Sequence, residues 1–247
     1  MKDIQNQQDY RRIDIKKVGV KTVTYPITVL DKAQSRQKTI ATINMYVNLP
    51  HRFKGTHMSR FIEILNYFHG KIDIKNFHQI LEEMKRRLNA EAAHMEMVFP
   101  FFLRRNDGSD ALRISRYECT MSCFLGDVDD LRIDLAVPIS YPPAEDGSAE
   151  RGGLWGTARV SVRFKRFMWL EDLIDIVEAT IKTEMAAHRQ GVDHLGQPME
   201  TLLERLDRRL STLTELRWYE ITVENLSRGY SLFAATSGPE LLSNTAG

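Results

Sequence analysis

The apolar residues of this chain change their spacing from every second residue to every third or fourth and back, and they do so twice. Alternation at every second residue is typical of a strand with one buried face, and a period near 3.6 is typical of an amphipathic helix. Two alternating segments, two helical segments and two further alternating segments fill each half of the chain. The sequence therefore predicts an α+β protein made of two tandem ββααββ units.

The repeat also predicts how the chain is divided and how it assembles. A four-stranded antiparallel sheet with two helices on one face leaves its edges exposed, and such edges invite pairing between units. We expect oligomerisation through sheets that join edge to edge, and Pro26 favours an edge position for the first strand. The expected parts are an N-terminal arm (1–17), the first unit (18–127), the second unit (128–238) and a tail (239–247).

The individual elements follow from the same periodicity. In the first unit the predicted strands span 23–30, 39–50, 94–104 and 112–125, and the predicted helices run from Thr56 to Gly70 and from Ile74 to Ala90. In the second unit the predicted strands span 131–139, 157–164, 217–223 and 231–235, and the predicted helices span 169–188 and 199–210.

Composition and hydropathy argue against nucleic-acid partners, membrane insertion and secretion. Lys plus Arg number 34 against 33 Asp plus Glu, and a net charge of +1 gives no reason to expect binding to nucleic acid or to an anionic membrane. No segment reaches the roughly 18 apolar residues of a membrane span, and the N-terminal residues lack the apolar core of a signal peptide. A cytoplasmic location is therefore expected by default.

The densest polar cluster is LPHRFKGTHMSRF, which lies between a predicted strand and a predicted helix at residues 49–61. Its Lys54, His57, Ser59 and Arg60 lie at or just inside the helix N-terminus, where free backbone N–H groups and the helix dipole favour an anion. These four residues are candidate phosphate contacts. The structural alternative is that Thr56 caps the helix, Arg60 pairs with a carboxylate and His57 packs at an interface.

The remaining chemistry-bearing residues are interpreted as structural. Cys119 and Cys123 are the only cysteines, and on a strand their Cα atoms would lie about 13 Å apart, too far for a disulfide or shared zinc ligation. His188 and His194 match no standard ligand spacing and read as exposed polar residues. Glu200 lies early in a helix, where an acidic residue complements the dipole.

The segment from YPITVLDKAQ through FKGTHMSRFIEILN, at residues 25–66, resembles the GTP cyclohydrolase I type B family of tunnelling-fold proteins. The resemblance extends to VGVK at 18–21, WLEDLIDIVE at 169–178 and RWYEITVEN at 217–225. It implies a homotetramer of tandem ββααββ units with active sites at subunit interfaces. It also implies conversion of GTP and water to 7,8-dihydroneopterin triphosphate and formate, in folate-type pathways, with a divalent metal such as Zn, Mn or Fe.

The chain departs from the family pattern where the resemblance places the chemistry. The family's Cys-Pro-Cys segment is replaced by VPISYPP at 137–143, its His-rich run by LWGTARV at 154–160, and its C-terminal His motif by SRGYSL at 227–232. The segment AAHRQGVDHLGQ, at 186–197, is a shortened form of the family segment that carries a metal-binding Glu. The family's metal ligands and catalytic histidines are thus missing, so no cofactor is expected and no catalytic residue is assigned. The Glu that holds the guanine edge in the family aligns with Glu200.

Two functions follow from this pattern. The first is a catalytically impaired paralogue that binds a purine or pterin such as GTP, or acts as a scaffold, as a homo-oligomer or in a mixed oligomer with a complete homologue. The alternative is an active GTP cyclohydrolase in which His188, His194 or Glu184 substitute for the missing ligands. A carboxylate such as Glu200 suits a purine ligand because its two oxygens accept from the guanine N1–H and amine together.

Overall fold

The structure is a computed structural model of the 247-residue chain. It describes residues 17–48, 58–69, 72, 76–105, 113–127, 129–140, 154–189, 198–226 and 230–238. Lys54, Thr56, His57 and His194 lie outside the described residues, as do the side chain of His188 and the predicted tail.

The order of elements is ββααββ followed by ββααββ, as the periodicity predicts. The first set comprises β1 (Val18–Asp31), β2 (Ser35–Asn48), α1 (Ser59–Tyr67), α2 (Phe77–Leu88), β3 (Ala92–Arg105) and β4 (Arg113–Leu125). The second set comprises β5 (Asp129–Ser140), β6 (Leu154–Phe164), α3 (Leu170–Arg189), α4 (Pro198–Leu210), β7 (Leu216–Leu226) and β8 (Ser231–Ser237).

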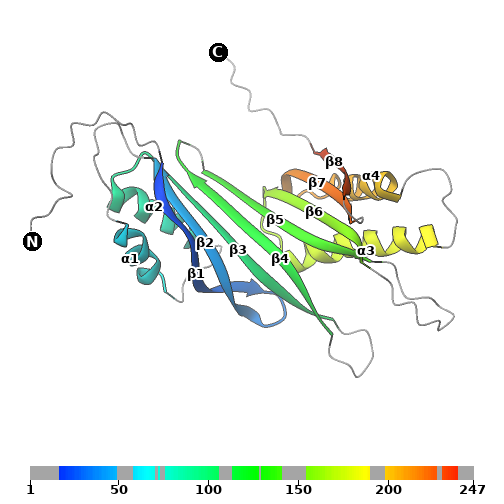
Figure 1. Ribbon diagram of the computed structural model, residues 1–247, viewed down its shortest axis with the longest axis horizontal. Helices are drawn as coiled ribbons and strands as arrows, with labels where there is room; N and C mark the ends of the chain where they lie inside the picture. Colours follow the sequence, from blue (N-terminus) through cyan, green and yellow to red (C-terminus); the bar gives the residue numbers. More distant parts are fainter. Residues whose placement is uncertain are drawn as a thin grey trace, which may run out of the picture. The chain divides into compact units, whose positions relative to one another are not determined.

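The eight strands form one sheet in sequence order, from β1 at one edge to β8 at the other (Figure 1). Every strand pair whose register is described is antiparallel. Pro26 lies in β1, an edge strand, which agrees with its inability to donate a ladder hydrogen bond. The fold class predicted from sequence, α+β with antiparallel pairing, is therefore confirmed.

The chain forms two compact units, one containing residues 1–100 and 120–131 and the other containing residues 101–119 and 132–247. Strands β3 and β4 thus contribute residues to both units. The division of the chain into domains at residues 127 and 128 stays a prediction.

The first unit has its core between the strands and helices α1 and α2. Alternate residues of β2, including Ile43, Met45 and Val47, are fully buried, and the apolar stripes of α1 and α2 are buried with them. Tyr25 of β1 ties α1 in place, because its hydroxyl donates to the Leu65 carbonyl at 3.1 Å. This anchor fixes the helix whose first turn carries Ser59 and Arg60.

The second unit is built in the same way around α3 and α4. Alternate residues of β5, β6 and β7 are buried, and so are the apolar stripes of α3 and α4, which together include Leu135, Val160, Ile221, Leu173 and Leu206. The intervening residues of these strands are more exposed and more polar. We call the face that they form the open face of the second unit.

The element ends differ from the predicted ones. Helix α1 begins at Ser59, so the predicted start was too early. The residue at its N-cap position is Met58, whose side chain makes no capping hydrogen bond. Helix α2 spans Phe77–Leu88, which starts later and ends two residues earlier than predicted. Strand β1 begins at Val18, five residues before the predicted start. The prediction missed these residues because Gly19 and Thr22 interrupt the apolar alternation, although the strand continues through them.

Candidate functional site

The predicted site residues are divided between the two units. Ser59 and Arg60 are exposed in the first turn of α1, in the first unit. Glu200 is exposed in the first turn of α4, in the second unit, where its charge complements the helix dipole as the sequence predicts. Ser59 and Arg60 thus lie in one compact unit and Glu200 in the other.

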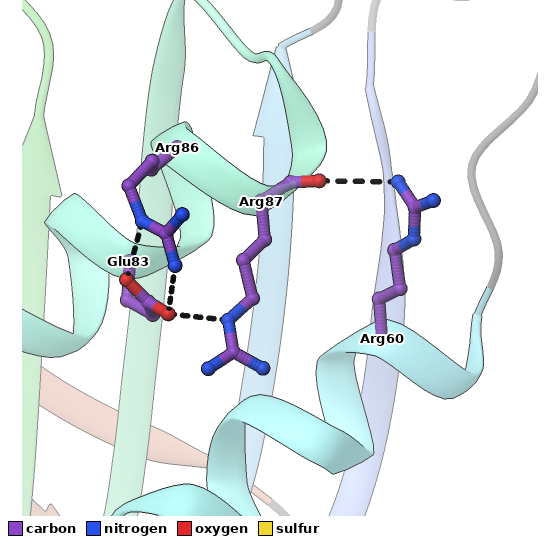
Figure 2. A network of polar contacts seen from close by, with 4 residues as sticks. All are labelled: Arg60, Glu83, Arg86 and Arg87. Atoms are coloured by element: carbon purple, nitrogen blue, oxygen red, sulfur yellow. Dashed lines mark hydrogen bonds and ion pairs between the residues drawn. The ribbon is translucent and has the colours of Figure 1, made fainter.

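Arg60 is part of a network that joins α1 to the last turn of α2 (Figure 2). Its Nη1 atom donates to the Arg87 carbonyl at 3.1 Å, so Arg60 contacts a backbone oxygen and not the carboxylate of the structural alternative. Glu83 accepts from Nε and Nη2 of Arg86, at 2.9 and 2.6 Å, and from Nε of Arg87. Two guanidinium groups, those of Arg86 and Arg87, therefore contact the Glu83 carboxylate, and the third, that of Arg60, contacts the Arg87 backbone.

The guanidinium groups of this network are divided between the two ends of α1. Arg60 lies in the first turn, whereas the Arg87 guanidinium lies 5.2 Å from the centre of the ring of Tyr67, the last residue of α1. The Arg86 side chain is 69% exposed, and both Arg86 and Arg87 contact Glu83. Cations in the last turn of α2 also complement that helix's dipole. Guanidinium groups bind phosphate oxygens through two parallel N–H bonds, so Arg60 is the arginine of this network that is placed to meet an anion at the N-terminus of α1.

Sequence reasoning identified Arg60 but missed Glu83, Arg86 and Arg87. The available signal was the spacing of Glu83 three and four residues before the two arginines, which is typical of ion pairs on a helix surface. The contact from Arg60 to the Arg87 carbonyl is a tertiary contact that spacing does not reveal.

Glu83 gives this network a measurable dependence on pH. Hydrogen bonds from Arg86, and with them the nearby Arg87 charge, lower the pKa of Glu83 from 4.5 to about 2. A depressed carboxyl pKa stabilises the fold above the unfolded-state value and loses that contribution as the pH falls toward the folded-state value. The stabilisation is therefore complete above about pH 5 and disappears as the pH falls from 4.5 to about 2.

We expect Glu83→Gln to lower the free energy of unfolding by about 1 kcal/mol at pH 7, because the ion pairs are partly exposed. The difference between this variant and the wild type should shrink as the pH falls from 5 to about 2. Urea denaturation at a series of pH values measures it. Glu63→Gln, an exposed change on α1, is the matched control and should show no such trend. A difference that does not change with pH would rule out the charge network as its source.

In the second unit, the described parts of three of the four segments that depart from the family pattern meet at one end of the sheet. Ile139 pairs with Gly156, Gly156 pairs with Asn225, and Asn225 pairs with Leu232. This row crosses β5, β6, β7 and β8, so residues 137–140, residues 154–160 and the start of β8 lie side by side (Figure 1). Segments that are far apart in the sequence therefore form one local surface.

The row has no donor set suited to the divalent metal that the resemblance implies. Its described members are Ile139, Gly156, Asn225 and Leu232, which offer neither thiol nor imidazole. The one polar side chain, Asn225, donates from Nδ2 to the Trp155 carbonyl at 3.0 Å. Over the described part of the chain, no three His, Cys, Asp or Glu residues gather in a way that could hold a metal ion.

Both cysteines lie in β4, as plain strand residues, in agreement with the prediction. Cys119 is buried and Cys123 is half-buried. Burial raises the pKa of each thiol to about 12. Because the thiolate is the nucleophilic form, neither thiol is suited to act as a nucleophile.

Glu184 was one candidate for a substitute ligand. It lies in α3, is 1% exposed, and its Oε2 atom lies 2.5 Å from Nε of Arg205 in α4. The carboxylate is thus engaged in an ion pair between the two helices. Of the candidate substitutes, it is the one whose side chain the structure describes, and its Oε2 atom makes no hydrogen bond within the described residues, although it lies close to the Arg205 charge.

Comparison with solved structures shows the fold. The chain matches uricase from Arthrobacter globiformis with a TM-score of 0.55 at 9% identity, covering 94% of this chain and 96% of that one. It matches urate oxidase from Bacillus subtilis 168 with a TM-score of 0.56 at 10% identity, covering 90% and 98%. The tunnelling fold predicted from sequence is therefore confirmed.

Comparison with sequences shows the family. Residues 1–190 match the family model described as type I GTP cyclohydrolase folE2. A protein named GTP cyclohydrolase FolE2 from Syntrophus aciditrophicus is 42% identical over 239 residues, covering 91% of this chain and 94% of that protein. One of the same name from Syntrophotalea carbinolica is 38% identical over 257 residues, covering 97% and 96%. The chain belongs to the GTP cyclohydrolase FolE2 family.

Proposed function

We propose that this chain is a non-catalytic member of the GTP cyclohydrolase FolE2 family that binds GTP or a related purine or pterin without converting it to 7,8-dihydroneopterin triphosphate and formate. The observation that carries the proposal is the row across β5–β8, in which Ile139, Gly156, Asn225 and Leu232 bring three of the four replaced segments together. Opening the imidazole ring at C8 requires an activated water, and a bound metal lowers the pKa of water from 15.7 toward about 7. Aliphatic and amide side chains do not supply such a ligand set.

The proposed binding residues are those that the sequence suggests. Arg60 meets the phosphate groups together with Ser59, and Lys54 and His57 precede them in the sequence. Glu200 accepts from the N1–H and amine of the purine, since its exposed carboxylate has two oxygens for two adjacent donors. Because these groups belong to two compact units, we propose that assembly of subunits completes the site.

The proposed assembly is a homotetramer joined at the sheet edges, or a mixed oligomer with a complete homologue. Large apolar side chains that are exposed in β8 and just before it support this assembly. Tyr230, Leu232 and Phe233 are 65%, 47% and 71% exposed at the edge of the sheet. Apolar side chains on an open edge are typical of a strand that pairs with another chain. No helix in the described parts of the chain is both long enough and apolar enough to cross a membrane. A cytoplasmic location stays a prediction.

An active cyclohydrolase is the alternative, and the 42% identity to a protein named GTP cyclohydrolase FolE2 favours it. Activity would require substitute ligands. The candidate substitutes are Glu184, whose carboxylate lies beside Arg205, and His188 and His194.

Incubation of the purified protein with GTP and Mn²⁺ or Zn²⁺ separates the two functions. After oxidation, we expect no pterin fluorescence, whereas calorimetry should show GTP binding. Light scattering on the same sample reports the assembly state. Pterin formation that a chelator abolishes would overturn the non-catalytic proposal.

The ligand contact is tested with Glu200→Gln, which leaves one acceptor oxygen in place of two. We expect GTP binding to weaken by about tenfold or more, as for loss of a hydrogen bond to a charged group. Glu204→Gln, an exposed change one turn later on α4, is the matched control. Equal GTP affinity in the two variants would remove Glu200 from the site.

A further inference from the structure

The first unit, like the second, has an open face, which the intervening residues of β2, β3 and β4 form. Three rings are stacked across it. Tyr46 of β2 pairs with His94 of β3, and their ring centres lie 4.2 Å apart with an angle of 16° between the planes. The ring centre of Phe124, in β4, lies 4.5 Å from that of His94. Because β3 lies between β2 and β4, the imidazole is held between the two other rings.

A cation lies at the outer end of this stack. Nζ of Lys17, the residue before β1, lies 4.9 Å from the centre of the Tyr46 ring. Aromatic faces attract cations through the ring quadrupole. Since β1 and β3 flank β2, Lys17 and His94 approach Tyr46 from opposite sides. Lys17 is exposed, so its ammonium group can leave the ring and enter water readily.

The start of β1 is joined to β2 by a short, separate piece of ladder. Residues 18–20 are half-buried and pair with residues 45–47, and regular pairing resumes at Val23 after a register shift. Thr22, within that shift, has a φ of 57°, and its N–H donates to Oδ1 of Asn44 at 2.9 Å. A bulge of this kind interrupts the ladder. Residues 17–20 can therefore separate from β2 while the rest of β1 stays paired.

The surroundings of His94 favour its neutral form. Its Nε2 atom is buried and has no hydrogen-bond partner within the described residues, so a proton there would gain no acceptor among them. Burial, and after it the charge of Lys17, lowers the pKa of His94 from 6.5. The stack at neutral pH thus holds one cation, on Tyr46, and one neutral imidazole.

The other titratable neighbours do not reverse this preference. Tyr46 of β2 is a neutral phenol at pH 7, and Phe124 of β4 does not titrate. Glu96 lies two residues from His94 on the same side of β3, and its Oε1 atom accepts from Nδ2 of Asn44 at 2.7 Å. The attraction of this carboxylate for a proton on His94 opposes the effects of burial and of Lys17. Those two effects prevail, since the pKa of His94 is lowered.

We propose that His94 and Lys17 form a pH-sensitive switch at the start of the edge strand β1. When the imidazole takes up a proton from solvent, it becomes the cation that the Tyr46 and Phe124 rings hold, and its charge displaces Lys17 from the opposite face of Tyr46. Residues 17–20 then separate from β2, and residues 45–47 lose their pairing on that side. The switch requires neither a bound ligand nor turnover.

The direction of the pH effect follows from proton linkage. Because the pKa of His94 is lowered in the closed form, the open form binds more protons below pH 6.5. The short ladder is therefore most stable above pH 6.5 and weakens as the pH falls below that value. With one proton involved, the opening equilibrium rises by up to about tenfold per pH unit.

The test is hydrogen exchange of the full chain at a series of pH values, corrected for the pH dependence of the intrinsic exchange rate. The protected amides within residues 18–20 should lose protection by up to about tenfold per pH unit below pH 6.5, whereas those within residues 23–30 should not. An NMR titration of the His94 imidazole should give a pKa below 6.5.

Two variants identify the groups responsible. His94→Phe keeps an aromatic ring between Tyr46 and Phe124 but cannot take up a proton, so exchange at residues 18–20 should no longer depend on pH. Lys17→Met removes the competing cation. The pKa of His94 should rise in this variant, and the pH dependence at residues 18–20 should shrink.

Each variant has a matched control. Lys21→Met removes an exposed cation from the bulge, and His78→Gln removes an exposed histidine from α2, where its Nδ1 atom lies 2.9 Å from a carboxylate oxygen of Asp129. Both controls should keep the wild-type exchange profile at residues 18–20.

Exchange at residues 18–20 that does not change with pH in the wild type would overturn the proposal, and so would a pH dependence that persists in His94→Phe. A Lys17→Met protein with the wild-type His94 pKa would refute the competition between the two cations. An effect of Lys21→Met as large as that of Lys17→Met would show a general effect of charge and would equally refute it. If His94→Phe does not fold, the exposed Lys17→Met change and the wild-type titration decide the matter.

Discussion

Replacing Arg205 with Ala is expected to lower the free energy of unfolding by about 3–5 kcal/mol, because the change leaves a buried carboxylate without its counter-charge. Glu184, in α3, is 1% exposed, and its Oε2 atom lies 2.5 Å from Nε of Arg205 in α4. A buried ion pair contributes little to stability compared with an apolar pair of the same size. Removing one partner is costly, however, because it leaves the other charge buried without compensation. Urea denaturation of the variant and the wild type measures the difference.

Two further variants separate this effect from a general loss of packing. Arg209→Ala removes an exposed cation from the last turn of the same helix and should change stability by less than about 0.5 kcal/mol. Adding Glu184→Leu to Arg205→Ala removes the stranded charge and should recover much of the lost stability. If Arg205→Ala were as stable as Arg209→Ala, the burial of Glu184 would not depend on the Arg205 charge, and the proposed ion-pair contribution would be refuted.

The order of elements was predictable because each element has one buried face and one exposed face. Strand β2 buries Ile43, Met45 and Val47 at every second position, and α2 buries Ile80, Leu81 and Met84 at helical spacing. The ends of elements were less predictable. Strand ends depend on backbone pairing. Strand β1 continues to Val18 because Val18 pairs with Val47 of β2, although the residues of β1 lose the apolar alternation there.

The local sequence pattern is not sufficient to predict which residues of a candidate site lie together in the fold. The sequence identifies four departures from the family pattern, but only the registers of β5, β6, β7 and β8 show that described parts of three of them meet in one row. A register shift between Ile139 and Ser140 lies directly beside that row, and such irregularities are set by tertiary packing. The contact between Tyr46 and His94 likewise depends on pairing between β2 and β3, which no spacing within either segment reveals.

Replacing Gly156 with Ala is expected to lower the free energy of unfolding by about 2–3 kcal/mol and to disturb the row at the end of the second-unit sheet. A Cβ atom at this position would lie 2.1 Å from the Glu224 carbonyl oxygen and 3.0 Å from its carbon. Because the obstacle is backbone, β6 and β7 must separate locally, which weakens the Asn225 bond to the Trp155 carbonyl. Chemical denaturation measures the loss, and hydrogen exchange of the β7 amides locates it.

Gly126→Ala is the matched control, since its added Cβ would lie 2.4 Å from the tip of the Phe124 ring, which is a side chain that can turn away. It should cost less than Gly156→Ala. Equal stability of the two variants would mean that β6 and β7 accommodate the methyl group without moving the Glu224 backbone. In that event the row would be tolerant of substitution, and the loss of the family's Cys and His residues there would reflect relaxed packing and not a site reshaped for a different ligand.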